Sequence, residues 1–219
     1  GAPAANFVQR HRQQLFATTP MVLTAVAQRR IQHSSLTEND SVVALAQNFP
    51  AVIENILHVL PDTKTVAVVI GNSPLERFWL EVLRKEFAPF ADRLSFIWYN
   101  DRSFADILKH AAALPPHSAI YWHQMNVDAA GVVHEGDKGL STLYAVANAP
   151  IFSFTDAFFG GEVVGGPMNS VVEAARVTVA VAVRILGGEK AGDIKTPPIG
   201  FATPKFDWRQ MERWGISES

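Results

Sequence analysis

The feature of this sequence that most constrains its fold is a repeated unit, a short apolar segment followed by an amphipathic helical pattern. The short segments are rich in Val, Ile and aromatic residues, and most are apolar on both faces, as strands of a covered parallel sheet are. Strands that alternate with helices form mainly parallel sheets. We therefore predict an α/β fold with doubly wound parallel sheets. The expected strands are Pro20–Val26, Ser41–Ala46, Thr65–Ile70, Leu94–Tyr99, Ser118–His123, Pro150–Phe154, Glu162–Gly165 and Ile199–Ala202.

Two helix starts are marked by capping boxes, in which Ser precedes Glu by three positions. Ser73 with Glu76 opens one helix, and Ser170 with Glu173 opens another. Each helix carries a stripe of apolar residues at helical spacing, which is typical of a helix packed on a sheet. The two stripes are Trp79, Leu80, Leu83 and Phe87 in the first helix, and Val172, Ala175, Val179, Val183 and Leu186 in the second.

Composition argues against several classes of partner and chemistry. Charged residues make up 18% of the chain, the net charge is -2, and acids and bases are scattered, so no nucleic-acid surface is expected. The sequence has no Cys, which excludes disulfides, thiolate zinc sites and a cysteine nucleophile. Its seven His residues lack the short pair spacings of metal sites. No segment fits a membrane helix or a signal peptide.

Motifs for catalysis and cofactor binding are also missing. The segment Gly160–Gly166 is rich in glycine, but it lacks the Lys-Ser/Thr of a phosphate loop and the context of a dinucleotide site. We interpret it as a hinge crossing with a turn at each end. No Gly-x-Ser-x-Gly elbow is present, and Asp128, Glu135 and Asp137 lie in a polar stretch typical of a solvated loop. The prediction is therefore no metal, no cofactor and no catalysis, although an enzyme on such a fold stays open as a further alternative.

Six segments occur in one fixed order along the chain. They are Thr65–Ile70, Gly71–Pro74, Ala119–Trp122, Ala149–Phe152, Val163–Gly166 and Phe206–Gly215. Together they resemble the ABC-transporter substrate-binding-like family of type I periplasmic binding proteins. More narrowly, they resemble the extracytoplasmic sensor regions of bacterial histidine kinases, in which a closing Phe-Asp-Trp-Arg-Gln motif precedes a membrane helix. The resemblance extends from Phe16 onward.

This resemblance implies a receptor of two lobes, with residues 1–47 and 162–219 in the first lobe and residues 48–161 in the second. The expected crossovers lie near Gln47–Pro50, Gly160–Gly161 and Gly200–Pro204, each of which contains Gly or Pro. The chain opens with a helical pattern at Asn6–Arg12 and no strand before it, so we expect a first lobe that is incomplete at its start. An incomplete sheet has an unpaired edge, and we therefore expect a homodimer.

Ligands of parallel α/β sheets lie beyond the carboxyl ends of the strands, and this rule selects the candidate site. The resemblance adds the crossover segments to the strand ends. The predicted ligand contacts are Thr24, Ala25, Asn48, Phe49, Asn72, Ser73, His123, Gln124, Met125, Thr155, Asp156, Phe158, Met168 and Asn169.

Several of these residues have an equally ordinary structural interpretation. Ser73 and Asn169 suit helix caps as well as ligand contacts. Asp156 suits either an anchor for an amine or hydroxyl of the ligand or a clamp on its own loop. Phe158 suits an apolar wall of the site or the core.

The expected function is a sensor domain for a small organic ligand, in which closure of the lobes on the ligand is coupled to signalling. The closing segment Phe206–Gly215 favours this hypothesis over a soluble substrate-binding protein of an ABC transporter, which is the alternative. In either case the domain is expected to be extracytoplasmic, with membrane attachment only through segments outside this chain. The mixed polar and apolar strand ends favour an amphiphilic ligand, amino-acid-like or aromatic.

Overall fold

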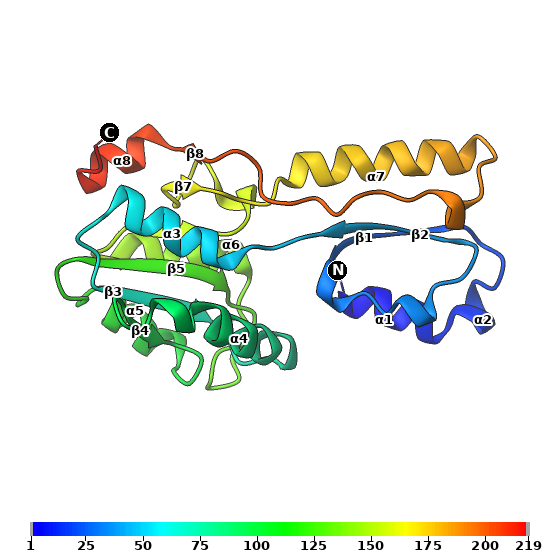
Figure 1. Ribbon diagram of the computed structural model, residues 1–219. Coiled ribbons are helices and arrows are strands. Elements are labelled where there is room, and N and C mark those ends of the chain that lie inside the picture. The colour runs from blue at the N-terminus through cyan, green and yellow to red at the C-terminus, as the bar shows by residue number, and fades with distance from the viewer. Residues whose placement is uncertain (1, 218–219) are drawn as a thin grey trace. The chain divides into compact units, whose positions relative to one another are not determined.

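The computed structural model describes residues 2–217, which divide into two units (Figure 1). Unit 1 contains residues 2–47 and 169–202, and unit 2 contains residues 48–168 and 203–217. Both are α/β, and the prediction of parallel sheets between helices is confirmed in each.

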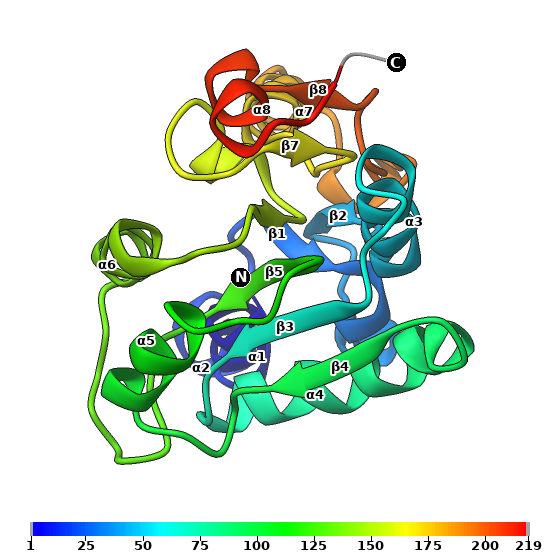
Figure 2. The ribbon, with the colours of Figure 1, turned by 90° about the vertical axis from the view of Figure 1, so that its left-hand side faces the viewer.

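Unit 2 is built on a four-stranded parallel sheet in the order β4-β3-β5-β6. Figure 2 shows β5, β3 and β4 side by side. The strands of unit 2 are β3 (Thr65–Ile70), β4 (Ser95–Trp98), β5 (Ser118–Gln124), β6 (Ile151–Ser153), β7 (Gly165–Gly166) and β8 (Lys205–Phe206). Its helices are α3 (Phe49–Val59), α4 (Pro74–Phe87), α5 (Phe104–Ala111), α6 (Gly136–Val146) and α8 (Trp208–Trp214), with short 3-10 helices at Ala88–Phe90 and Asp156–Phe158.

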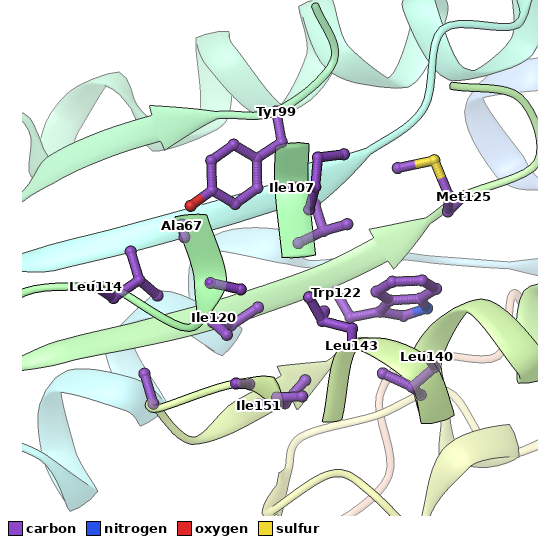
Figure 3. Close-up of a cluster of buried hydrophobic side chains, with 14 of the residues drawn as sticks. Ala67, Tyr99, Ile107, Leu114, Ile120, Trp122, Met125, Leu140, Leu143 and Ile151 are labelled. Atoms are coloured by element: carbon purple, nitrogen blue, oxygen red, sulfur yellow. The ribbon is translucent and has the colours of Figure 1, made fainter. Parts of the chain in front are cut away.

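Alternate residues of β5 point to opposite faces of this sheet and meet different helices. Ile120 and Trp122 belong to a buried apolar cluster with residues of α5 and α6 (Figure 3). On the other face, Tyr121 lies against Phe87 of α4, with ring centroids 5.6 Å apart. Because both faces are covered, the strands are apolar throughout, and this is why Thr65–Ile70 was predicted with its observed bounds.

Unit 1 contains a smaller parallel sheet of two strands, β1 (Met21–Ala27) and β2 (Asp40–Leu45). A strand was expected at Ile199–Ala202. In the described residues this segment forms only a single parallel bridge, between Ile199 and Leu45. The helices of unit 1 are α1 (Ala2–Arg10), α2 (Arg12–Leu15) and α7 (Val171–Leu186), with short 3-10 helices at Gln28–Arg30, His33–Ser35 and Ala191–Asp193.

The units differ from the expected lobes in two segments. Residues 162–168 and 203–217 belong to unit 2 and not with residues 1–47. The reason is that β7 pairs antiparallel with β8, which brings the closing segment to β7. The residue before β7 is in turn bonded to the main sheet of unit 2, because the Val164 N–H donates to the Ile151 carbonyl at the start of β6 (2.8 Å). The division between units therefore falls after Met168 and after Ala202. The segment Gly160–Gly166, expected as a crossing, lies wholly within unit 2.

The pairing of β7 with β8 requires glycine at Gly165. Its φ is +119°, a conformation that residues with a side chain rarely adopt. A Cβ at this position would lie 2.1 Å from the Lys205 carbonyl oxygen. The strand expected at Glu162–Gly165 is accordingly reduced to two glycines whose backbones approach the closing segment of the chain.

The two predicted helix stripes have opposite outcomes. In α4, Trp79, Leu80, Leu83 and Phe87 are all buried, as predicted. In α7 the predicted core stripe is wrong, because most of its residues are exposed: Val172 by 76%, Val179 by 60%, Val183 by 61% and Leu186 by 87%, with Ala175 also exposed. The residues of α7 that pack on unit 1 are Ala174 and Val181, with Val177 and Ile185 partly buried beside Val181.

Candidate functional site

The candidate site in unit 2 lies at the carboxyl edge of the sheet, where β3, β5 and β6 end. These three strands are neighbours and run parallel, so the loops that follow them emerge at the same edge. Asn72 and Ser73 follow β3, Gln124 ends β5, and Thr155 and Asp156 follow β6. The structure thus brings together, along one edge, the strand-end residues that were predicted from unit 2.

The buried carboxylate of Glu76 holds two of these loops together. Its Oε2 accepts a hydrogen bond from the Ser73 N–H (2.9 Å), and its Oε1 accepts one from the Asn126 N–H (2.6 Å). The Ser73 hydroxyl accepts in return from the Glu76 N–H (3.3 Å), which completes the capping box. A Cβ on Gly71 would lie 2.5 Å from Oε1, so glycine is needed where the chain passes this carboxylate.

Asn72 and Gln124 lie on the two loops that Glu76 connects. The Asn72 N–H donates to the Val127 carbonyl (2.7 Å), and the Gly71 N–H donates to the Gln124 carbonyl (2.9 Å). Both side chains are half-buried. Their backbones are therefore fixed while their amide groups stay accessible for donating and accepting hydrogen bonds.

His123 is the centre of an aromatic cluster beside these loops. Its ring stacks on Phe154 (4.7 Å, 22°) and meets Phe49 edge-on (5.3 Å, 76°) and Trp79 at a tilt (5.8 Å, 54°). Its Nδ1 lies 3.1 Å from the Tyr121 hydroxyl oxygen. Burial among these rings disfavours the charged imidazolium and lowers the pKa of His123 to about 3, so the side chain is neutral at physiological pH.

Asp156 forms an ion pair with Lys205 of β8, with the Lys205 Nζ 3.2 Å from its Oδ2. The same ammonium lies 4.6 Å from the centroid of the Phe159 ring. Thr155 caps the following turn by accepting a hydrogen bond from the Ala157 N–H (3.4 Å). The Asp156 side chain is 8% exposed, so Lys205 of the closing segment neutralises a carboxylate that is largely removed from water.

Four predicted contacts of unit 2 lie inside the core or against it. Met125 is 1% exposed and packs in the cluster with Trp122 and Leu140 (Figure 3), where Phe158 also packs from its edge. Phe49 and Met168 are also buried. Each is an apolar residue at or near the end of a strand or helix. The sequence alone does not show whether such a residue lines a pocket or packs in the core. Asn48 is exposed and caps α3 by accepting from the Ala51 N–H (3.4 Å).

The predicted residues of unit 1 have structural partners of their own. Thr24 lies within β1, and its hydroxyl is 2.6 Å from that of Thr178 in α7. Ala25 is exposed, has a φ of +53° and sits at the bulge in β1. Asn169 is not a helix cap, because Ser170 has that role in α7. The Asn169 Nδ2 donates to a carbonyl oxygen of Gly200 (3.2 Å), and its Oδ1 is buried without a hydrogen-bond partner.

Sequence reasoning missed four residues that shape the edge in unit 2. They are Glu76, Trp79, Phe154 and Lys205. Glu76 had a local signal, the capping box, but its second bond joins residues 50 positions apart. Lys205 is 49 positions from Asp156 and had no signal.

The cavities of the structure do not coincide with the candidate site at the carboxyl edge of the sheet. A cavity of about 590 Å³ lies in unit 2 at the amino ends of β5 and β6, and is lined by loops that include Thr63, His117 and Asn148. None of the predicted contacts lines it. We therefore locate the candidate site by its convergent polar groups. Within residues 2–217 there is no group of three or more His, Asp or Glu side chains placed to hold a metal ion, and no helix is long and apolar enough to cross a membrane.

Solved structures share the fold at low sequence identity. The ABC domain in complex with L-Trp from Streptococcus pneumonia aligns with a TM-score of 0.67 and 18% identity, over 100% of this chain and 74% of that one. A ligand-free, open substrate-binding protein with adhesive properties from Clostridium difficile aligns with a TM-score of 0.65 and 14% identity, over 91% and 68%. A LacI family transcriptional regulator from Bifidobacterium animalis subsp. lactis aligns with a TM-score of 0.54 and 11% identity, over 94% and 82%.

These similarities identify the fold as that of type I periplasmic-binding-protein-like structures. Models of protein families and curated proteins gave no match to the sequence.

Proposed function

We propose that this chain binds a small organic molecule at the carboxyl edge of the unit 2 sheet and acts as an extracytoplasmic substrate-binding protein of the ABC-transporter type. The observation that carries the proposal is the convergence of Asn72, Gln124 and Asp156 on the ends of three neighbouring parallel strands. Binding sites of open α/β sheets occupy this position.

The chemistry of the edge suggests a class of ligand. Asn72 and Gln124 offer amide donors and acceptors, and Asp156 offers a carboxylate. The neutral His123 and its aromatic neighbours form an apolar region nearby. This combination suits an amphiphilic molecule with a polar head and an aromatic or apolar body, and the L-Trp held by the neighbour from Streptococcus pneumonia is of that kind.

The proposed contacts in unit 2 are the polar strand-end residues, since Met125 and Met168 are buried in the core. Asn72 and Gln124 are half-buried, and the Asp156 side chain is 8% exposed, so a ligand would reach Asp156 only at its exposed edge or by displacing Lys205. Thr24, Ala25 and Asn169 of unit 1 stay predicted contacts. The proposed role is binding without catalysis, because no catalytic motif was recognised in the sequence.

A histidine-kinase sensor domain is the second candidate, and its support is the closing segment Phe206–Gly215. In unit 2 this segment has specific contacts, since Gln210 donates to the Tyr144 hydroxyl (2.8 Å) and to the Gly161 carbonyl (2.7 Å). A sensor can use such contacts to report ligand binding to a segment that follows. A run of about 20 apolar residues after Ser219, leading to a kinase, would favour the sensor over the transporter component.

Calorimetric titration with L-Trp and a panel of the other amino acids tests the proposal. We expect one or more to bind, and Asp156→Ala to weaken that binding by about 1–3 kcal/mol, because a buried charged or polar group of the complex is left unpaired. Asp92→Ala is the matched control, since Asp92 is an exposed carboxylate before β4, at the amino edge of the sheet. Absence of binding across the panel, or equal affinity of Asp156→Ala and the parent, contradicts the proposed site.

A further inference from the structure

The last two elements of the chain, β8 and α8, form one continuous segment, Lys205–Trp214, which we call the β8–α8 segment (Figure 1). Its first residue contacts the loop that follows β6, residues 154–161. The Lys205 Nζ lies 3.2 Å from the Asp156 Oδ2 and 4.6 Å from the centroid of the Phe159 ring. The Asp156 side chain is 8% exposed and the Lys205 side chain 45%. The accessible partner of this ion pair is therefore the ammonium of the β8–α8 segment.

The same loop holds the segment at two further points. The Arg209 Nη2 donates to the Gly160 carbonyl (2.8 Å), and the Gln210 Nε2 donates to the Gly161 carbonyl (2.7 Å). Each of these contacts, like the ion pair, joins residues 49 positions apart. The segment thus runs beside the loop in the same direction and in constant register. A change at the start of the loop can for this reason be felt along the whole segment.

Away from this loop the segment packs on Tyr144 of α6, and the rest of its packing is loose. Of its seven residues, α8 buries Gln210 and Met211. A cavity of about 520 Å³ is lined by Trp208 and Met211, and another of about 590 Å³ by Trp214. In the described part of the chain, the Gln210 Oε1 and the Trp214 Nε1 are buried without a hydrogen-bond partner. Cavities and unsatisfied polar groups both lower the free-energy cost of opening a segment locally.

We propose that the Asp156–Lys205 ion pair holds the β8–α8 segment in place, and that a ligand ammonium bound at Asp156 loosens the segment. The inference rests on the proposed function, which places the ligand at Asp156. A ligand ammonium competes with Lys205 for one carboxylate, so its binding weakens the contact between loop and segment. By linkage, opening of the segment favours binding of that ammonium to the same extent. Ligand binding and segment docking are then coupled through Asp156.

Hydrogen exchange of one backbone amide measures the docking of the segment. The Asp207 N–H donates to the Val164 carbonyl (2.8 Å), so it exchanges only when β8 separates from the β7 side. Under native conditions the rate of exchange follows the population of the locally open state. The Leu83 amide, inside α4, is the internal reference for the rest of unit 2.

A double-mutant cycle tests the ion pair without any ligand. Asp156→Asn and Lys205→Met should each speed the exchange of the Asp207 amide about fivefold relative to Leu83. The double variant should be no faster than either single variant, because the pair is already broken. Asp92→Asn is the matched control, an exposed carboxylate at the amino edge of the sheet, and should leave the rate unchanged. Independent effects of the two substitutions, or exchange at the parent's rate in all three variants, overturn the inference.

Saturation with L-Trp tests the release of the segment. We expect the Asp207 amide to exchange about fivefold faster relative to Leu83 in the parent, as in the variants, and to be unaffected in Lys205→Met. Indole-3-propionate, which lacks the ammonium, should not cause this change. Bound L-Trp that leaves the relative rate unchanged overturns the inference while the proposed function stands. Absence of binding by any amino acid contradicts the proposed function, and the release step with it.

Discussion

Helices α4 and α7 begin with the same capping sequence and carry similar apolar stripes, yet one stripe is buried and the other exposed. The difference lies in the sheets beneath them. Helix α4 packs on the four-stranded sheet of unit 2 beside α3, whereas α7 lies on the two strands of unit 1. Two strands span only about 10 Å, roughly the width of one helix, so a helix that is apolar around most of its surface keeps one side uncovered.

The largest expected effect comes from matched truncations in the two stripes. Phe87→Ala should destabilise unit 2 by about 3–5 kcal/mol, because Phe87 is 1% exposed and packs against Phe96 and Tyr121. Val183→Ala in α7 should change the stability of unit 1 by less than about 0.5 kcal/mol, since this side chain is 61% exposed.

Urea unfolding measures both variants with separate probes. All five Trp residues belong to unit 2, so their fluorescence follows the unfolding of that unit. Far-ultraviolet circular dichroism follows the loss of helix in both units, and so also detects the unfolding of unit 1. A loss of more than 2 kcal/mol from Val183→Ala at low protein concentration would mean that the α7 stripe is covered within a single copy.

The second comparison concerns the glutamates of the two capping sequences. Glu76→Gln should cost about 1.5–3 kcal/mol, because an amide cannot supply two acceptors to the buried N–H groups of Ser73 and Asn126. Glu173→Gln should leave stability unchanged, since Glu173 is exposed and its side chain binds Arg176 and not the cap. Equal losses in both variants, measured by urea unfolding, would contradict the bridging role of Glu76.

His123 predicts a pH dependence that is specific to unit 2. Its pKa is about 3 in the folded chain and about 6.5 when unfolded, so the unfolded state binds more protons between these values. Stability is then complete above pH 6.5 and is lost as the pH falls toward 3, with about 2 kcal/mol lost between pH 7 and pH 5. His123→Gln should remove this part of the pH dependence. Tryptophan-detected urea unfolding at the two pH values checks it, and an unchanged slope in the variant would argue against a neutral buried histidine.

How far the sequence predicted the fold depended on the range of the interactions. The strands at Thr65–Ile70 and Ser118–His123 are buried on both faces, so their apolar runs gave nearly the observed bounds. The pairing of Gly165 with Phe206 joins residues 41 positions apart and has no local signature. The α7 stripe was misassigned because periodicity identifies an apolar side of a helix but not the extent of the sheet available to cover it.

The candidate site shows the same limit. The rule that ligands lie at carboxyl ends of parallel strands selected Asn72, Gln124 and Asp156, which the structure places on neighbouring strand ends. The rule does not distinguish an apolar residue in the wall of a binding site from one in the hydrophobic core, and Met125 lies in the core. Nor does it identify Lys205, whose place beside Asp156 depends on the return of the chain from unit 1.

The smallest expected effect, on stability, comes from Leu186→Lys at the end of α7. Leu186 is 87% exposed, so its replacement removes no core contact, and a cation in the last turn interacts favourably with the helix dipole. We expect the stability of unit 1 at low concentration to rise by about 0.3–0.5 kcal/mol. Circular dichroism melts of the variant and the parent at the same low concentration measure this small difference. A destabilised variant would mean that Leu186 is covered by another part of the chain.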